Sequence, residues 1–168
     1  AVNFGIVYGI SDFGLARNIG VTRKEAAAFI EKYFARYPRI KAYMDDCVRV
    51  GRQQGYVTTL LGRRRNLPEL ASTNYQTRSF GERAAMNMPL QSTAADIIKA
   101  AMLRVHAALK GKPAKLILQV HDELLVECPD CEAAAVSRIL TGEMENAVKL
   151  SVPLLAEAHT GHSWAEAH

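Results

Sequence analysis

Residues 116–127 read LILQVHDELLVE, and this stretch decides how the last part of the chain folds. Two apolar, β-rich runs, 116–120 and 124–126, flank a short polar break, and that pattern predicts a β-hairpin. The polar break consists of His121, Asp122 and Glu123. The hairpin should therefore present one imidazole and two carboxylates from a rigid element.

The two carboxylates of this break should have different roles. Successive side chains on a strand point to opposite faces, so Asp122 and Glu123 cannot share one set of ligands without a local bend. We expect one of them to face a site and the other to support it. A carboxylate at a hairpin tip suits a hard divalent cation such as Mg²⁺. The alternative is that the aspartate is present only because it favours turns.

Composition and charge limit the classes of protein. The chain has 168 residues, of which 49% are hydrophobic, enough for one domain or two small subdomains with a real core. It carries 21 Lys+Arg against 17 Asp+Glu, a net charge of +4 that only weakly indicates a polyanionic partner. No run has the roughly 18 apolar residues of a membrane span. The first residues have no basic n-region and no cleavage site, so we do not expect them to be a signal peptide, and without an initiator Met we expect the chain to be a fragment.

The cysteines indicate a reducing compartment rather than a disulfide framework. Cys128 and Cys131 have the C-x₂-C spacing of a zinc or redox motif. His159 and His162 could complete a zinc set, although their spacing is tighter than is usual for zinc-binding histidines. A chance pair of thiols at a strand–helix junction is the favoured interpretation.

The spacing of apolar residues and the positions of glycine and proline predict an α+β fold. Helices come first, followed by strand, strand, helix and strand, so an antiparallel sheet should form at the C-terminal end. The expected helices cover residues 1–8, 11–20, 22–36, 38–54, 74–88, 92–109 and 130–149, with Pro89 interrupting or kinking the long one. The expected strands cover 56–60, 65–67, the two arms of the hairpin and 153–158.

Three polar residues recur every four positions in the long helical segment: Arg83, Asn87 and Gln91. On a helix they form one stripe of donors and acceptors. Such a row could follow a sugar–phosphate edge or a minor groove, where the acceptors depend little on sequence. The alternative is an ordinary solvated face.

A second basic feature follows Gly62, where Arg63, Arg64 and Arg65 occupy a predicted turn near Tyr56 and Tyr75. Three guanidinium groups at a turn could clamp phosphates. A solvated turn is the alternative interpretation.

Near the N-terminus, Phe4 and Tyr8 lie four residues apart and share one helical face. Such a pair could stack on a base or nucleotide, although core packing explains it as well.

Four motifs, taken in order, make the chain similar to a known family. They read NFGIVYG (3–9), TLLGRRRNLP (59–68), ERAAMNMPLQSTAAD (82–96) and QVHDE (119–123). This order resembles the C-terminal part of family A DNA polymerases of the bacterial polymerase I type, over essentially the whole chain. Two departures are Ser92, where glycine is usual, and a less glycine-like stretch at 159–162.

The resemblance implies a role for each matching residue in nucleotide and DNA binding. Phe4 would pack against the sugar of the incoming nucleotide, and Tyr8 would stack near the templating position. The DNA contacts would come from Arg63, Arg64, Arg65, Arg83, Asn87 and Gln91.

The hairpin residues would carry the catalytic roles. His121 would approach the primer terminus, and Asp122 would hold the Mg²⁺ ions that activate the 3′-hydroxyl. Glu123 would belong to the same catalytic group.

The resemblance also implies a division into a helical fingers segment, 1–93, and an antiparallel β palm segment, 94–168. The partners would be primer–template DNA and a dNTP, with no membrane, in the bacterial cytoplasm near the nucleoid. We expect this chain to be inactive alone, because the family's other catalytic aspartate and its triphosphate-binding lysine belong upstream of residue 1. We also expect it to self-associate, because upstream sequence would supply further strands of the palm sheet and their absence would leave an edge and an apolar face bare. A non-catalytic nucleic-acid-binding module and a small zinc module are the competing hypotheses.

Overall fold

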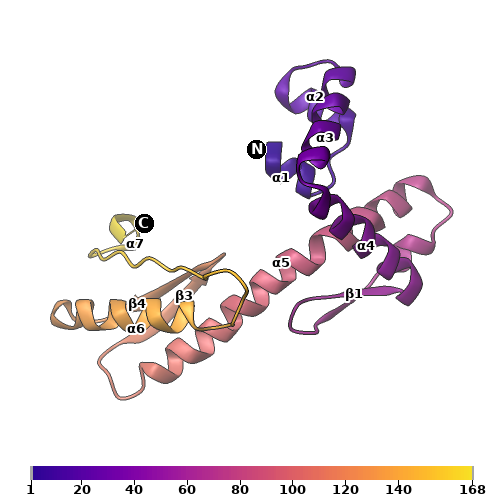
Figure 1. The fold of residues 1–168 in the computed structure, drawn as a ribbon. Coiled ribbons are helices and arrows are strands. Elements are labelled where there is room, and N and C mark those ends of the chain that lie inside the picture. Colours follow the sequence, from indigo (N-terminus) through magenta and orange to yellow (C-terminus); the bar gives the residue numbers. More distant parts are fainter. Residues whose placement is uncertain (1, 168) are drawn as a thin grey trace. The chain divides into compact units, whose positions relative to one another are not determined.

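The computed structural model describes residues 2–167, except that the side chains of Phe4 and Val7 lie outside the described part. The chain separates into two compact units, Ala1–Thr93 and Ala94–His168. Helices dominate the first unit, and the second contains a β-hairpin with helices beside it, so the predicted α+β class is confirmed (Figure 1).

The first unit opens with three helices, two of which have starts set by side-chain caps. The helices are α1 (Val2–Val7), α2 (Asp12–Ile19) and α3 (Arg23–Arg36). The Ser11 side chain accepts a hydrogen bond from the Gly14 N–H, and Gly20 ends α2 in the left-handed conformation. Thr22 and Glu25 form both hydrogen bonds of a capping box at the start of α3. The predicted starts of α2 and α3 are thus confirmed.

Helix α4 (Pro38–Gln54) leads into a small antiparallel pair, β1 (Tyr56–Thr58) and β2 (Arg64–Asn66). The predicted pair is present, but β1 is shorter than expected, because residues 59–63 form a hydrogen-bonded turn. A 3₁₀ helix, η1 (Pro68–Ala71), follows β2 and leads to the long helix α5.

Helix α5 (Tyr75–Ala108) continues through Pro89, so the predicted interruption is wrong, whereas the alternative of a kink at Pro89 stays a prediction. Proline removes one backbone hydrogen bond and disfavours a helix interior by about 3 kcal/mol. Here Ala85 and Met88 are buried in a core just before the proline, and that packing keeps the helix intact. The Thr93 hydroxyl donates to the Pro89 carbonyl at 2.5 Å.

Two apolar clusters hold the first unit together. One joins α1, α2 and α3 through Leu15, Ala16 and Ala26, with Val2, Ile10 and Ile30 packed against them. The other joins the β1–β2 pair, η1 and α5 through Val57, Leu67, Leu70, Ala84, Ala85 and Met88, with Val48 of α4 packed against it.

The second unit is built on the predicted hairpin, β3 (Lys115–Val120) and β4 (Glu123–Glu127). Ile117 is an extra residue in β3, because the register shifts between Leu116 and Leu118. The second half of α5 and helix α6 (Ala133–Glu145) pack on this hairpin (Figure 1). Their shared core contains Ala101, Val105, Leu109, Ala114, Leu124 and Val136.

The end of the chain differs from expectation. Helix α6 follows a 3₁₀ turn, η2 (Asp130–Glu132), and ends at Glu145 instead of Lys149. The predicted strand at 153–158 is wrong, because that stretch has no ladder partner in the described residues. The Ala156 N–H donates instead to Glu145 Oε1 at 3.2 Å. A short helix, α7 (Trp164–Ala167), closes the described part.

Candidate functional site

The hairpin tip is a two-residue turn made of His121 and Asp122, since Val120 pairs with Glu123. His121 has a φ of 52°, which is the left-handed region that few residues other than Gly adopt, although Asn, Asp and His adopt it more often than the rest. Gln119 Nε2 donates to the His121 carbonyl at 2.6 Å and helps to hold the turn. Both turn side chains are exposed, so the carboxylate of Asp122 is open to solvent.

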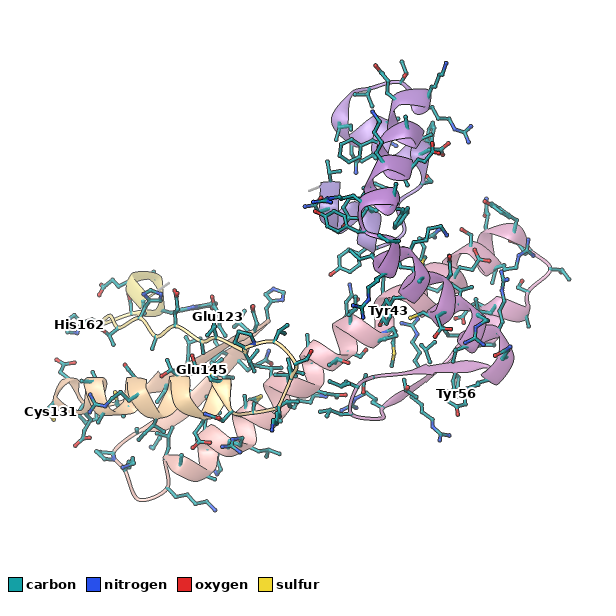
Figure 2. The ribbon with its side chains drawn as sticks, viewed as in Figure 1. Tyr43, Tyr56, Glu123, Cys131, Glu145 and His162 are labelled. Carbon is teal, nitrogen blue, oxygen red and sulfur yellow. The ribbon has the colours of Figure 1, made fainter. Side chains whose placement is uncertain are left out.

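Glu123 lies in a different environment from Asp122. It is the first residue of β4, where it is half-buried and directly precedes the buried Leu124 (Figure 2). One carboxylate thus sits in the exposed turn and the other on a strand. That the two carboxylates take separate roles stays a prediction.

Asp122 is the residue that the sequence predicts as a metal ligand. Within residues 2–167, no group of three or more His, Cys, Asp or Glu side chains is close enough to hold a metal ion. An exposed carboxylate fits Mg²⁺ as one of its oxygen ligands, since this ion often takes only one or two protein carboxylates. The described residues alone do not assemble a complete site.

The alternative zinc set is contradicted. Cys131 lies in η2 before α6, whereas His162 lies in the C-terminal segment, and within the described part of the chain these ligands do not come together (Figure 2). Both Cys128 and Cys131 are free thiols. Burial raises the pKa of the Cys128 thiol, with a further contribution from Asp130, and both effects disfavour the thiolate that zinc requires.

The predicted polar row lies on α5 in the first unit. Arg83 and Gln91 are exposed, and Asn87 is half-buried. Arg83 Nη1 donates to Ser79 Oγ at 2.9 Å. The Oδ1 atom of Asn87 is buried without a hydrogen-bond partner. Because buried polar atoms normally have partners, this acceptor is available to a donor from water or a ligand.

The end of α1 packs directly on this row. Gly9 follows Tyr8 with a φ of 75°, and a Cβ atom on Gly9 would lie 2.6 Å from Met86 Cε and 3.5 Å from Arg83 Cγ. The fold therefore joins the first and third of the four sequence motifs. Tyr8 is half-buried at this junction. The side chain of Phe4 lies outside the described part, so its role stays a prediction.

The basic turn is ordered by its own hydrogen bonds. The Thr59 N–H donates to the Arg63 carbonyl at 2.9 Å, and the Arg63 N–H donates to Thr59 Oγ1 at 3.0 Å. Arg63, Arg64 and Arg65 are all exposed. The Arg64 guanidinium lies over the Tyr56 ring, 4.7 Å from its centroid.

The second tyrosine expected near this turn has another partner. Tyr75 has the guanidinium of Arg78 over its ring, 5.9 Å from the centroid. Of the two tyrosines, Tyr56 is therefore the one that stacks with an arginine of the turn.

Sequence reasoning missed the residue that ties the basic turn to α5. Thr93 Oγ1 accepts a hydrogen bond from the Leu60 N–H at 3.0 Å while donating to the Pro89 carbonyl. The available signal was a threonine four residues after a proline in a helix, because its hydroxyl can reach the carbonyl of that proline.

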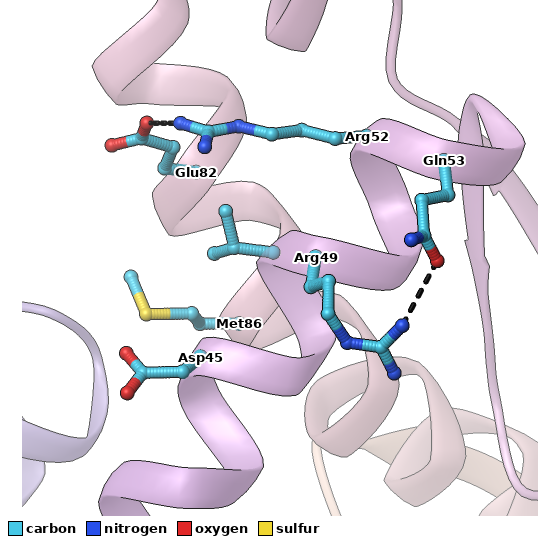
Figure 3. Close-up of a pocket in the computed structure, with 7 residues that line it drawn as sticks. Asp45, Arg49, Arg52, Gln53, Glu82 and Met86 are labelled. Atoms are coloured by element: carbon cyan, nitrogen blue, oxygen red, sulfur yellow. Dashed lines mark hydrogen bonds and ion pairs between the residues drawn. The ribbon is translucent and has the colours of Figure 1, made fainter.

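A cavity of about 570 Å³ lies between α4 and α5 (Figure 3). Its arginines already have partners in the chain, since Arg52 pairs with Glu82 across the cavity and Arg49 Nη1 donates to Gln53 Oε1 at 2.9 Å. Phosphate would have to compete with these contacts. We therefore assign the cavity's charged residues to helix packing.

Sequence comparison identifies the family. The sequence profile of DNA polymerase family A matches residues 1–166, so the chain belongs to this family. It is 55% identical over 169 residues to DNA polymerase I of Geobacillus stearothermophilus and 54% identical over 169 residues to that of Bacillus subtilis strain 168. These matches cover 99% of this chain but 19% of each relative, so the chain spans about a fifth of their length.

A solved structure gives the same result for the fold. The POL domain of Pol1 from M. smegmatis, in complex with DNA primer–template and dNTP, matches with a TM-score of 0.95 and 43% identity. The match covers 99% of this chain and 30% of that chain. Among residues 2–167, no helix combines the length and apolar character needed to cross a membrane.

Proposed function

We propose that this chain supplies the fingers segment (1–93) and the palm segment (94–168) of a DNA-templated DNA polymerase. In the reaction, the primer 3′-hydroxyl oxygen attacks the α-phosphorus of a dNTP, and the bond from that phosphorus to pyrophosphate breaks. The location would be the bacterial cytoplasm, near the nucleoid. The observation that carries the proposal is the exposed Asp122 in a constrained two-residue turn of a family A chain.

Asp122 would act at the reacting end of the primer. Its exposed carboxylate can hold a Mg²⁺ ion, and the neighbouring His121 can donate or accept at the primer terminus. Bound Mg²⁺ would lower the pKa of the 3′-hydroxyl and balance the charge on pyrophosphate. Glu123, half-buried on β4, would support the turn from the adjoining strand.

The first unit would bind the nucleotide and the two DNA strands. Support comes from the packing of Gly9, the residue after Tyr8, on Arg83 and Met86 of α5. Asn87, with its buried acceptor lacking a partner, can take a donor from a base or a water at the nascent pair. The exposed arginines of the basic turn can neutralise backbone phosphates.

A chimeric polymerase tests the catalytic assignment. This chain would replace the matching fifth of the G. stearothermophilus enzyme, and primer extension would be measured with Mg²⁺ and four dNTPs. We expect extension by the chimera and none by its D122N variant, which keeps the shape of the side chain. The D130N variant removes another exposed carboxylate from the same unit and should extend normally. Equal activity of D122N and the parent chimera would contradict the assignment.

DNA binding is a separate test on the 168-residue chain itself. Replacing Arg63, Arg64 and Arg65 with Ala should weaken binding to primer–template DNA. The slope of log K against log[salt] should become shallower by about 0.9 for each DNA phosphate that is no longer neutralised. The control replaces Lys110, Lys112 and Lys115, which removes the same charge from the second unit. Equal slopes for the two triple variants would show that the arginine turn has no specific role.

A non-catalytic nucleic-acid-binding module is the second candidate function. It is favoured by the lack of three gathered metal-ligating side chains in residues 2–167. This candidate predicts salt-dependent DNA binding together with a chimera that cannot extend a primer. Extension that depends on Asp122 would exclude it.

A further inference from the structure

The basic turn is attached to the first unit at two separate points. At its base, Val57 of β1 and the adjacent Leu67 are buried in the core with Ala85 and Met88 of α5. At its tip, the Leu60 N–H donates to Thr93 Oγ1 at 3.0 Å. The tip itself is open to solvent, with Leu60 at 65% and Leu61 at 51% of full accessibility.

Thr93 is placed to determine where this tip lies. Its hydroxyl donates to the Pro89 carbonyl, so the oxygen is fixed relative to the part of α5 that carries Asn87 and Gln91. The same oxygen accepts from the Leu60 backbone. A hydroxyl can serve as donor and acceptor at once, which no apolar side chain of the same shape can do.

Resting on the proposed function, we infer that Thr93 is a positioning residue for DNA binding. Its hydroxyl holds the arginine turn against the proline-containing part of α5, so that the three arginines and the α5 polar row meet one DNA substrate in fixed register. Thr93 acts through the turn and not by touching DNA. Loss of the hydroxyl leaves the arginines charged and exposed, but lets the tip move, together with Arg63 in the turn and the start of β2 that carries Arg64 and Arg65.

The test compares T93V, which keeps the shape without the hydroxyl, with T93S, which keeps the hydroxyl. T93V should bind primer–template DNA between about twofold and tenfold more weakly, the range that corresponds to one hydrogen bond. Its salt slope should be shallower, and T93S should restore both quantities. T141V is the matched control, because the Thr141 hydroxyl also donates to a carbonyl four residues back, that of Ser137 at 3.1 Å, but in α6 of the second unit.

Two further measurements separate positioning from a general loss of structure. Hydrogen exchange at the Leu60 amide should be faster in T93V than in T93S, with the exchange of core amides in α5 unchanged. In the R63A/R64A/R65A background, T93V should cause no additional loss of affinity, because no arginine remains to be positioned. In the chimeric polymerase, T93V should raise KM for primer–template and leave kcat nearly unchanged.

Four outcomes would overturn the inference. In the first, T93V and the parent chain bind primer–template DNA with equal affinity, a result that contradicts the inference but not the proposed function. T93V could weaken binding equally with and without the three arginines, or no more than T141V does. A parent chain with no affinity for primer–template DNA would overturn the proposed function and this inference together.

Discussion

His121 is the residue at which local backbone preference and the fold disagree most clearly. It occupies the left-handed region at φ 52° in a turn that contains no glycine. Such a conformation disfavours an L-residue by roughly 1–2 kcal/mol, and persists only when the surrounding structure enforces it. The β3–β4 ladder on both sides of the turn provides that enforcement. A side chain kept in spite of strain is consistent with a role at the primer terminus.

Substitution of His121 should separate stability from activity. H121N should unfold at the same urea concentration or a higher one, since Asn tolerates the left-handed region. H121V should be less stable than H121N by about 1–2 kcal/mol, because a β-branched residue fits this region poorly. Both variants should lower primer extension in the chimera. Urea denaturation followed by circular dichroism measures the first part, and equal stability of H121V and H121N would contradict the strain.

At the scale of the elements, two glycines within helices differ in how closely another element packs against them. Gly81 lies in α5 against η1, and a Cβ atom there would be 2.9 Å from Glu69 Cβ and 3.0 Å from the Leu70 nitrogen. Backbone cannot move away as a flexible side chain can. Gly142 lies in α6, and apart from its chain neighbours and the backbone of its own helix, no atom of the described residues lies within 4 Å of the same position. The two glycines form a matched pair for substitution.

We expect opposite effects of alanine at these two sites. G81A should destabilise the chain by about 1–3 kcal/mol, because η1 must shift away from α5. G142A should stabilise it by about 0.5–1 kcal/mol, since alanine is the better helix former and meets no obstacle. Thermal or urea unfolding of both variants measures these changes in the free energy of unfolding. Stabilisation by G81A would mean that η1 does not pack closely on α5.

The same elements show what sequence could predict. Some elements are predicted correctly because the hydrogen bonds that define them join residues close in sequence. Examples are the capping box of Thr22 and Glu25 and the hairpin formed by the apolar runs around 121–123. The break predicted at Pro89 is wrong, because tertiary packing outweighs a local preference. The strand predicted at 153–158 fails for the opposite reason, since a strand needs a partner that no local pattern specifies.

The candidate site divides in the same way. Motifs in the sequence are enough to select the turn and the polar row as candidate site residues. The hydrogen bond from Leu60 to Thr93 joins positions 33 apart, and no motif predicts it. Spacing along the chain indicates which side chains share a helical face. It does not indicate which distant backbone group a hydroxyl will meet.

At the scale of the whole molecule, we expect the isolated 168-residue chain to incorporate no nucleotide. Asp122 alone cannot hold two Mg²⁺ ions against a triphosphate, because two-metal catalysis requires ligands on both sides of the reacting phosphate. The described residues gather no group of three metal-ligating side chains. Primer extension with Mg²⁺ and four dNTPs provides the measurement, with the chimera as positive control. Robust extension by the chain alone would show that its own residues complete the site.

We also expect the isolated chain to self-associate through its hairpin. Among the described residues the β3–β4 sheet has only two strands, so its outer edges have no partner strand. On β3, Ile117 is 56% exposed and Leu118 is 43% exposed. Unpaired edges and clustered apolar side chains both recruit other chains, and a second copy is the partner present at high concentration.

Light scattering over a range of concentrations tests this expectation. The parent chain should form dimers or larger species as concentration rises, whereas the I117K/L118K variant should remain monomeric, because lysine on an edge strand opposes pairing. L103K is the matched control, since Leu103 is 74% exposed on α5, outside the strands. It should associate like the parent. A parent chain that stays monomeric at every concentration would contradict self-association, and an equal effect of L103K would show that association does not use the hairpin edge.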